Sequence, residues 1–201
     1  MVGMKAARLE AFTDGVVAII ITIMVLEIHV PQGADLAALK ADVPVLLAYV
    51  LSYVNVGIFW VNHHHMLHVT ERVNGQVLWA NLVLLFWLSL VPFVIRWIDE
   101  TGFVAAPTAA YGVVLTCASL SYTNLQARII ELNGRESRLA RATGSDFKGK
   151  LSIALYVAGI LLAFVRPWLA IVLYVTVALI WLVPDTRIES LVGKQESPHE
   201  H

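Results

Sequence analysis

The chain alternates long apolar runs with short polar breaks, and six of the runs have the composition of buried or membrane helices. We expect helices over residues 8–30, 43–65, 76–98, 104–132, 151–165 and 168–183. Turn residues separate them, as at Pro31-Gln32-Gly33, Asn74-Gly75 and Arg166-Pro167. The pattern predicts an all-α membrane protein, with six transmembrane helices in a single domain over residues 1–201.

The first run, RLEAFTDGVVAIIITIMVLEIHV over residues 8–30, combines a polar start with an apolar middle. At about 1.5 Å per residue it spans roughly 34 Å, enough to cross a hydrocarbon core of about 30 Å. Asp14 needs a partner, because an unpaired charge inside a bilayer is costly. At about 100° per residue, one stripe away from Asp14 holds Gly15, Ile19, Thr22, Ile23 and Leu26. By periodicity alone, such a stripe is also typical of ordinary packing between membrane helices.

The composition supports a polytopic membrane protein. Of the 201 residues, 58% are hydrophobic and 14% are charged, and the mean hydropathy is +0.72. The formal net charge of −1 and the lack of a basic tract argue against a nucleic-acid partner. The one cysteine, Cys117, lies in an apolar run and cannot form an internal disulfide. The first run is too long for a signal peptide, and we expect it to be retained.

The distribution of Lys and Arg predicts the orientation. With six crossings both termini lie on one side, and that side collects eleven of the 14 basic residues. The other side holds only Lys40, Arg96 and Arg166. We therefore expect a multi-pass protein with both termini in the cytoplasm, so that the first helix starts inside and Leu26 lies toward the outside.

Four histidines crowd the end of the second helix, at His63, His64, His65 and His68. His64 and His68 have the i, i+4 spacing of a shared metal ion, but no carboxylates stand at matching offsets. Three consecutive histidines also point in three directions, so we expect no metal site. A carboxylate–imidazole contact with Asp14, which lies at the same end, is the preferred interpretation, and it would be sensitive to pH.

The sequence lacks the motifs of common enzymes and of a carbonyl-type potassium filter, and two residues after the first helix have two possible interpretations. There is no nucleophile elbow, HExxH, P-loop or dinucleotide fingerprint, so we expect neither an enzyme nor a cofactor. A TVGYG-type potassium filter is also missing. Glu27 and His29 follow the first helix at its outer end. They form either a solvated rim or a charged mouth that gathers cations.

The start of the first helix resembles a known signature. Residues Arg8–Gly15, RLEAFTDG, closely resemble the RxxxFSDG motif of the transmembrane protein 175 family. These proteins are potassium-selective channels of lysosomes, with shorter relatives in bacteria and archaea. Trp60, followed by His63 and His64, is similar to the family's second helix. Thr13 stands where serine is usual, and it keeps the hydroxyl.

The resemblance implies an assembly and a pore. The animal proteins carry two six-helix repeats and work as dimers, so a chain with one repeat implies a homotetramer in a prokaryotic inner membrane. In the family the first helices line a central pore. The residue five positions after the signature aspartate forms its narrowest point, which is Ile19 here. The next pore-facing positions carry over to Thr22, Ile23 and Leu26.

From these observations we predict a potassium-selective cation channel without a carbonyl-type filter. Its apolar constriction, formed by Ile19, Ile23 and Leu26, would act as a hydrophobic gate. Thr22 is the selectivity candidate, and Glu27 would concentrate monovalent cations at the outer mouth. K⁺ would be the permeant ion and not a cofactor, and the partners would be identical chains and membrane lipid. A structural network would hold the first helix in place. Its members would be Arg8, Phe12, Thr13, Asp14, Trp60, His63 and His64. The alternatives are a secondary transporter or proton-conducting protein that uses Asp14 and the histidines, and a non-conducting scaffold.

Overall fold

The computed structural model describes residues 6–31, 33, 36–134, 136–143 and 146–182. These residues form helices and connecting turns, and no β-strand occurs among them. The prediction of an all-helical chain is therefore confirmed. The helices are α1 (Ala6–Leu26), α2 (Leu36–His68), α3 (Gly75–Ser89), α4 (Val91–Thr101), α5 (Ala105–Asn133), α6 (Arg138–Thr143), α7 (Phe147–Ala163) and α8 (Pro167–Leu182).

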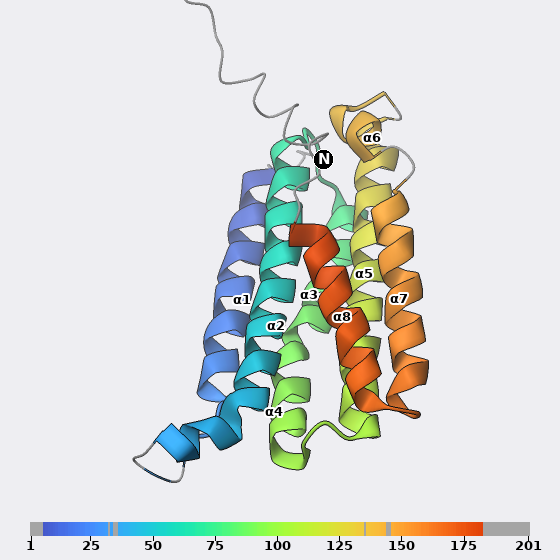
Figure 1. Cartoon of the computed structure of the whole chain (residues 1–201). Helices are drawn as coiled ribbons and strands as arrows, with labels where there is room; N and C mark the ends of the chain where they lie inside the picture. Colours follow the sequence, from blue (N-terminus) through green and yellow to red (C-terminus); the bar gives the residue numbers. More distant parts are fainter. Residues whose placement is uncertain (1–5, 32, 34–35, 135, 144–145, 183–201) are drawn as a thin grey trace, which may run out of the picture.

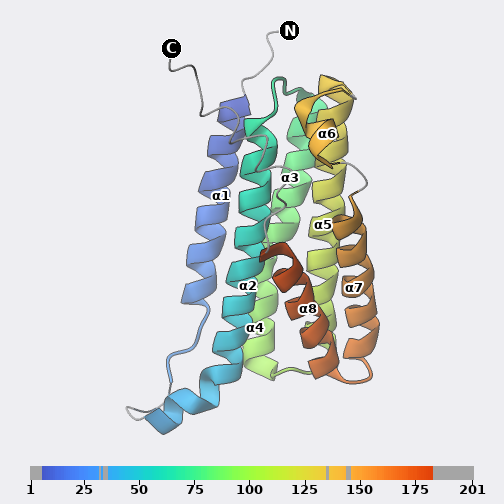
Figure 2. The same cartoon turned by 45° about the horizontal axis from the view of Figure 1, so that its top comes forward.

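The long helices stand side by side in one bundle, with α1 at one edge and α7 near the opposite edge (Figure 1). We call the end at which α1 begins the inner end, and the opposite end the outer end. α2 ends and α3 begins at the inner end, next to α6, whereas α4 ends and α5 begins at the outer end (Figures 1 and 2). The chain therefore runs up and down through the bundle, as repeated membrane crossings require.

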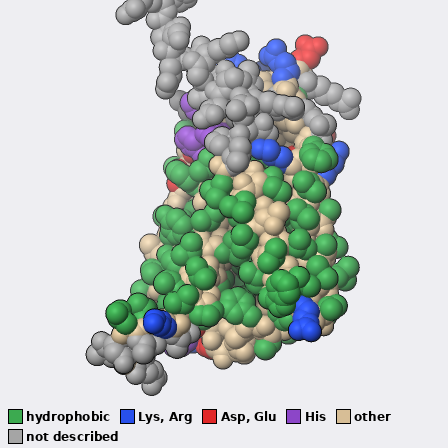
Figure 3. Space-filling view, viewed as in Figure 1, with side chains coloured by type: hydrophobic (Ala, Val, Ile, Leu, Met, Phe, Trp, Pro, Cys, Tyr) green, Lys and Arg blue, Asp and Glu red, His purple; other side chains and the backbone are tan. Residues whose placement is uncertain are grey.

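Hydrophobic side chains cover the middle of the bundle, and Lys and Arg side chains gather toward its two ends (Figure 3). Three segments are long and apolar enough to cross a membrane: Ala6–Leu26, Asp42–His68 and Gly75–Thr101. α8 is a shorter apolar helix. This surface fits a bilayer and not water, because a soluble monomer rarely exposes such a large apolar area. Six crossings stay a prediction.

The third segment is broken where the sequence predicted one helix over residues 76–98. α3 ends at Ser89 and α4 begins at Val91, with Leu90 between them. Pro92, in the first turn of α4, explains the break. Its nitrogen has no hydrogen to donate, and its ring clashes with the carbonyl four residues earlier.

The second helix begins earlier than expected, at Leu36 and not at residue 43. Residues 36–41 read LAALKA, and Leu, Ala and Lys are strong helix formers even where the run is only mildly apolar. Pro44 lies inside this helix. The first turns of α2 bend away from the rest of the bundle in Figure 1, as a proline within a helix favours.

The polar stretch between α5 and α7 contains α6, a short helix that the sequence did not predict. Leu139 anchors it, because only 2% of this residue is exposed. Gln126 of α5 also donates a hydrogen bond of 3.0 Å to the hydroxyl of Thr143. α7 then begins at Phe147, four residues before the expected start. The polar tail expected after Pro184 lies outside the described residues.

Candidate functional site

α1 buries only a narrow face, and the side opposite that face is exposed. Its buried residues are spaced by three or four positions, which is one side of a helix: Leu9, Thr13, Val17, Ile20 and Met24. The stripe predicted from the sequence lies on the uncovered side. Ile19 is 58% exposed and Leu26 is 80% exposed, and Thr22 and Ile23 are exposed between them. Within one subunit, nothing in the described residues covers this apolar face.

The hydroxyl of Thr22 turns back to its own helix. It donates a hydrogen bond of 2.9 Å to the carbonyl oxygen of Ile19, three residues earlier. A hydroxyl has one hydrogen and two acceptor lone pairs, so this bond leaves the oxygen able to accept. On the exposed stripe, Thr22 therefore presents an oxygen that can still accept, between aliphatic neighbours along the helix.

A buried hydrogen-bonded cluster ties the inner half of α1 to two other helices. Asn81 of α3 donates to the hydroxyl of Thr13 at 3.0 Å. The amide oxygen of Asn81 lies 2.8 Å from Nε2 of His63 on α2, which must therefore carry the hydrogen. All three residues are at most 1% exposed. We call Thr13, Asn81 and His63 the buried cluster.

A second pair of contacts lies beside this cluster and follows the antiparallel register of α1 and α2. Glu10 Oε1 lies 2.7 Å from Nδ1 of His64, and the indole N–H of Trp60 donates to Asp14 at 2.8 Å. Glu10 and Asp14 are one turn apart, as are Trp60 and His64. The expected contact between Asp14 and an imidazole is therefore wrong: Glu10 contacts the histidine, and Asp14 is satisfied by Trp60.

Two members of the predicted network stand apart from it. Phe12 is 51% exposed, and Arg8 is exposed and has no hydrogen bond or ion pair with any described residue. The histidines also do not gather around a metal position. Among the described residues, no group of three or more His, Cys, Asp or Glu side chains could hold a metal ion.

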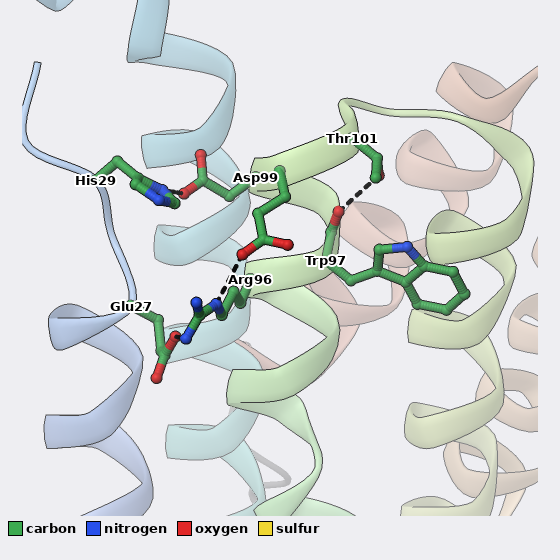
Figure 4. A network of polar contacts seen from close by, with 7 residues as sticks. Glu27, His29, Arg96, Trp97, Asp99 and Thr101 are labelled. Carbon is green, nitrogen blue, oxygen red and sulfur yellow. Dashed lines mark hydrogen bonds and ion pairs between the residues drawn. The ribbon is translucent and has the colours of Figure 1, made fainter. Parts of the chain in front are cut away.

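The outer end of α1 is held by charged side chains that the sequence did not connect. Glu27 pairs with Arg96 of α4 at 3.0 Å, and Arg96 also contacts Glu100 at 2.9 Å (Figure 4). Next to them, His29 pairs with Asp99. This contact raises the pKa of His29 above its ordinary value of 6.5, through the hydrogen bond and the charge of Asp99. Glu27 therefore lies at the end of the exposed stripe, as expected, but as part of an ion pair.

A further polar network lies inside the bundle, away from α1. The amide of Asn55 on α2 donates to the hydroxyl of Tyr111 on α5 at 3.2 Å, and Ser52 lies 3.0 Å from the same hydroxyl. Tyr156 of α7 donates to Asn55 at 3.4 Å. Every member is buried. These bonds join α2, α5 and α7, and they satisfy polar groups that hydrocarbon would leave unpaired.

Comparison with known proteins points to one family. The family model for "Endosomal/lysosomal potassium channel TMEM175" matches residues 8–92, from α1 to the start of α4. A potassium channel of Chryseobacterium sp. (strain P1-3) is 51% identical over 186 residues, which cover 92% of this chain and 97% of the relative. The human endosomal/lysosomal proton channel TMEM175 is 39% identical over 92 residues, which are 39% of this chain and 18% of the human protein.

The fold has also been seen before. The crystal structure of a lysosomal potassium-selective channel TMEM175 homolog from Chamaesiphon minutus superposes with a TM-score of 0.77, at 24% identity. The match covers 90% of this chain and 97% of that one. The two chains therefore share an architecture over nearly their whole lengths.

Proposed function

The chain belongs to the TMEM175 family of potassium channels, and from this premise we propose that it forms a potassium-selective channel whose pore is lined by α1 from four identical subunits. As a member of an ion-channel family, the protein is not an enzyme, and no cofactor is expected. The observation that carries the proposal is the uncovered face of α1, on which Ile19, Thr22, Ile23 and Leu26 are all exposed. A lone subunit leaves this face to lipid, whereas four subunits around an axis make it the wall of a pore.

The channel crosses the inner membrane of a prokaryotic cell six times per subunit in this proposal, with both termini in the cytoplasm. α1, α2, the α3–α4 unit, α5, α7 and α8 are the crossings. The distribution of charge supports the orientation, because most described basic residues lie toward the inner end. They are Arg8, Arg72, Arg128, Arg138, Arg141, Lys148 and Lys150, against Lys40, Arg96 and Arg166 toward the outer end.

Ile19 forms the constriction in this arrangement. A narrow ring of aliphatic side chains loses water, so it blocks ions without a plug, and conduction requires α1 to tilt or rotate. Replacing Ile19 with asparagine should raise the K⁺ current several-fold at equal protein amounts, because a polar ring stays wet. Val25→Asn is the matched control, since Val25 is exposed on α1 but lies off the stripe. An unchanged current in Ile19→Asn would move the narrowest point elsewhere.

Thr22 supplies the selectivity in the proposal. Four hydroxyl oxygens, each with its hydrogen turned to the Ile19 carbonyl, would replace part of the water shell of K⁺. Thr22→Val keeps the shape and removes the oxygen, so the K⁺/Na⁺ permeability ratio from reversal potentials should fall toward one. Thr22→Ser should keep most of the ratio. If Thr22→Val has the wild-type ratio, Thr22 is not part of the filter.

The buried cluster, with Glu10, Asp14, Trp60 and His64, has a structural role in this account. It sets the tilt of α1 against α2 and α3, and so places Ile19 and Thr22 at the axis. None of its bonds reaches the exposed stripe. Substitutions in it should therefore damage folding or assembly and leave the ion preference of the surviving channels unchanged.

The experiment that tests the whole proposal is K⁺ flux into liposomes that contain the purified protein. We expect flux down a K⁺ gradient above that of protein-free liposomes, slower flux of Na⁺, and a mass in detergent that corresponds to four chains. A protein that carries neither ion would contradict the channel function. Chains that remain single would contradict the central pore.

Proton conduction through the same pore is a second candidate, favoured by the name of the human relative, a proton channel. It makes a separate prediction for the reconstituted protein. With equal K⁺ on both sides, a pH gradient should shift the reversal potential toward the proton equilibrium potential. A reversal potential that stays at zero would exclude this activity.

A further inference from the structure

Glu27 occupies an unfavourable place for a carboxylate. It directly follows Leu26, the last residue of α1, and its backbone N–H donates to the carbonyl of Ile23 at 3.1 Å, which continues the helical bonding. The C-terminal end of a helix carries partial negative charge, so an acidic side chain there is destabilising unless a cation offsets it. Glu27 also stands one position beyond the outermost residue of the proposed pore.

Arg96 provides that cation. Its terminal nitrogen lies 3.0 Å from Glu27, while its Nε lies 2.9 Å from Glu100, one turn further along α4. Figure 4 shows Glu27 reaching toward the guanidinium of Arg96 from the end of α1. The planar fork of arginine suits such a bridge, because each nitrogen has its own direction.

Among the described residues, Arg96 is the basic side chain that forms an ion pair with Glu27. Lys40 and Arg166 form no ion pair with a described residue, and the imidazole of His29 is engaged with Asp99. The set of Glu27, Arg96 and Glu100 carries one net negative charge in each subunit. Loss of Arg96 would double that charge, and loss of Glu27 would cancel it.

We propose that Arg96 determines the electrostatic field at the outer mouth of the pore, by holding Glu27 in an ion pair and so limiting how strongly the mouth concentrates cations. This inference rests on the proposed function. Charges at a channel entrance raise the local concentration of the opposite ion. Salt screens the effect, because the Debye length falls from about 10 Å at 0.1 M to about 3 Å at 1 M. The ratio of the conductance at low salt to that at high salt therefore reports the charge of the mouth.

The test is the unitary K⁺ conductance in planar bilayers at about 0.1 M and about 1 M KCl. Arg96→Gln should raise the low-to-high ratio about twofold, because four more negative charges surround the mouth. Glu27→Gln should lower the ratio. The double variant should return it to the wild-type value, because the net charge is restored.

Two further variants separate charge from structure and from position. Arg96→Lys keeps the charge and should behave as the wild type. Arg166→Gln removes a positive charge at the same end but away from α1, at the α7–α8 turn, and should change the ratio little. The inference is overturned if Arg96→Gln leaves the ratio unchanged, if Arg96→Lys matches Arg96→Gln, or if Arg166→Gln has an equal effect.

The two proposals fail in different ways. A wild-type protein without K⁺ conductance would overturn the channel function and this inference with it. A conducting wild type in which Arg96 and Glu27 have no influence would overturn only the inference. If Arg96→Gln does not yield folded protein, Glu27→Gln still decides the question, because the proposal requires its ratio to fall.

Discussion

The two ends of α1 are attached to the subunit by different chemistry. At the inner end, Thr13 is hydrogen-bonded to Asn81, which contacts His63, and all three residues are buried. At the outer end, the contacts are the ion pairs of Glu27 with Arg96 and of His29 with Asp99. The side chains of Arg96 and His29 are 54% and 62% exposed.

This difference determines which end of α1 can move more easily relative to the rest of the subunit. A buried polar group that loses its partner costs about 1–3 kcal/mol, because neither water nor protein replaces the bond. Ion pairs that are open to water contribute little, and salt weakens them. The inner end is therefore the firm attachment of α1 and the outer end the adjustable one. In the proposed channel, a tilt of α1 that widens the ring of Ile19 side chains should pivot at the inner end.

The largest effect is expected from the buried cluster. Asn81→Leu leaves the Nε2 hydrogen of His63 and the hydroxyl of Thr13 without their partner, so unfolding should become easier by about 2 kcal/mol. Thermal denaturation in detergent, followed by size-exclusion chromatography, measures the change. Asn124→Leu is the control, since Asn124 is exposed on α5. Equal losses in the two variants would contradict the anchoring role.

A smaller effect is expected from the neighbouring pair of contacts. Trp60→Phe keeps most of the aromatic surface but removes the N–H that Asp14 accepts, so stability should fall by about 1 kcal/mol. Trp79→Phe serves for comparison, because Trp79 is 72% exposed and forms no hydrogen bond with a described residue. The same denaturation assay applies. If Trp79→Phe is the more damaging variant, the bond to Asp14 is not an anchor.

The smallest effect belongs to the outer end and depends on pH. The pKa of His29 is raised by Asp99, so its pair is fully formed below the ordinary value of 6.5 and disappears as the pH rises through the raised value. His29→Gln should therefore lower the melting temperature slightly at acidic pH and not at alkaline pH. His68→Gln, an exposed histidine at the inner end, should show no such dependence. A difference from wild type that grows with pH would reverse the predicted sign.

Local patterns in the sequence were sufficient for the helical content and for the stripe on α1, but periodicity alone did not decide whether that stripe packs against another helix or stays uncovered. The stripe through Ile19, Thr22, Ile23 and Leu26 follows from helical periodicity alone, and all four residues are exposed. The break in the third segment could also have been predicted, because Pro92 lacks a backbone donor and its ring clashes with the preceding turn. Pro44, in contrast, lies inside α2 without ending it. Neighbours within one or two turns decide these features.

The partners of the polar side chains could not be predicted in the same way. Asp14 was expected to contact a histidine, yet the register of α1 and α2 places Trp60 beside it and His64 beside Glu10. Arg96 was counted only as one of three basic residues on the outer side. Its position 69 residues after Glu27 carries no local signal for their contact.

By itself, the sequence determined that this protein is a helical membrane protein whose first helix has one smooth apolar face and a polar start. Hydrophobic length and period decide this, because both are properties of a single helix in a bilayer. Only the tertiary structure decided which side chains meet: the buried cluster at the inner end and the ion pairs at the outer end. Such contacts depend on how far one helix is turned and shifted against another, and that follows from packing over the whole bundle.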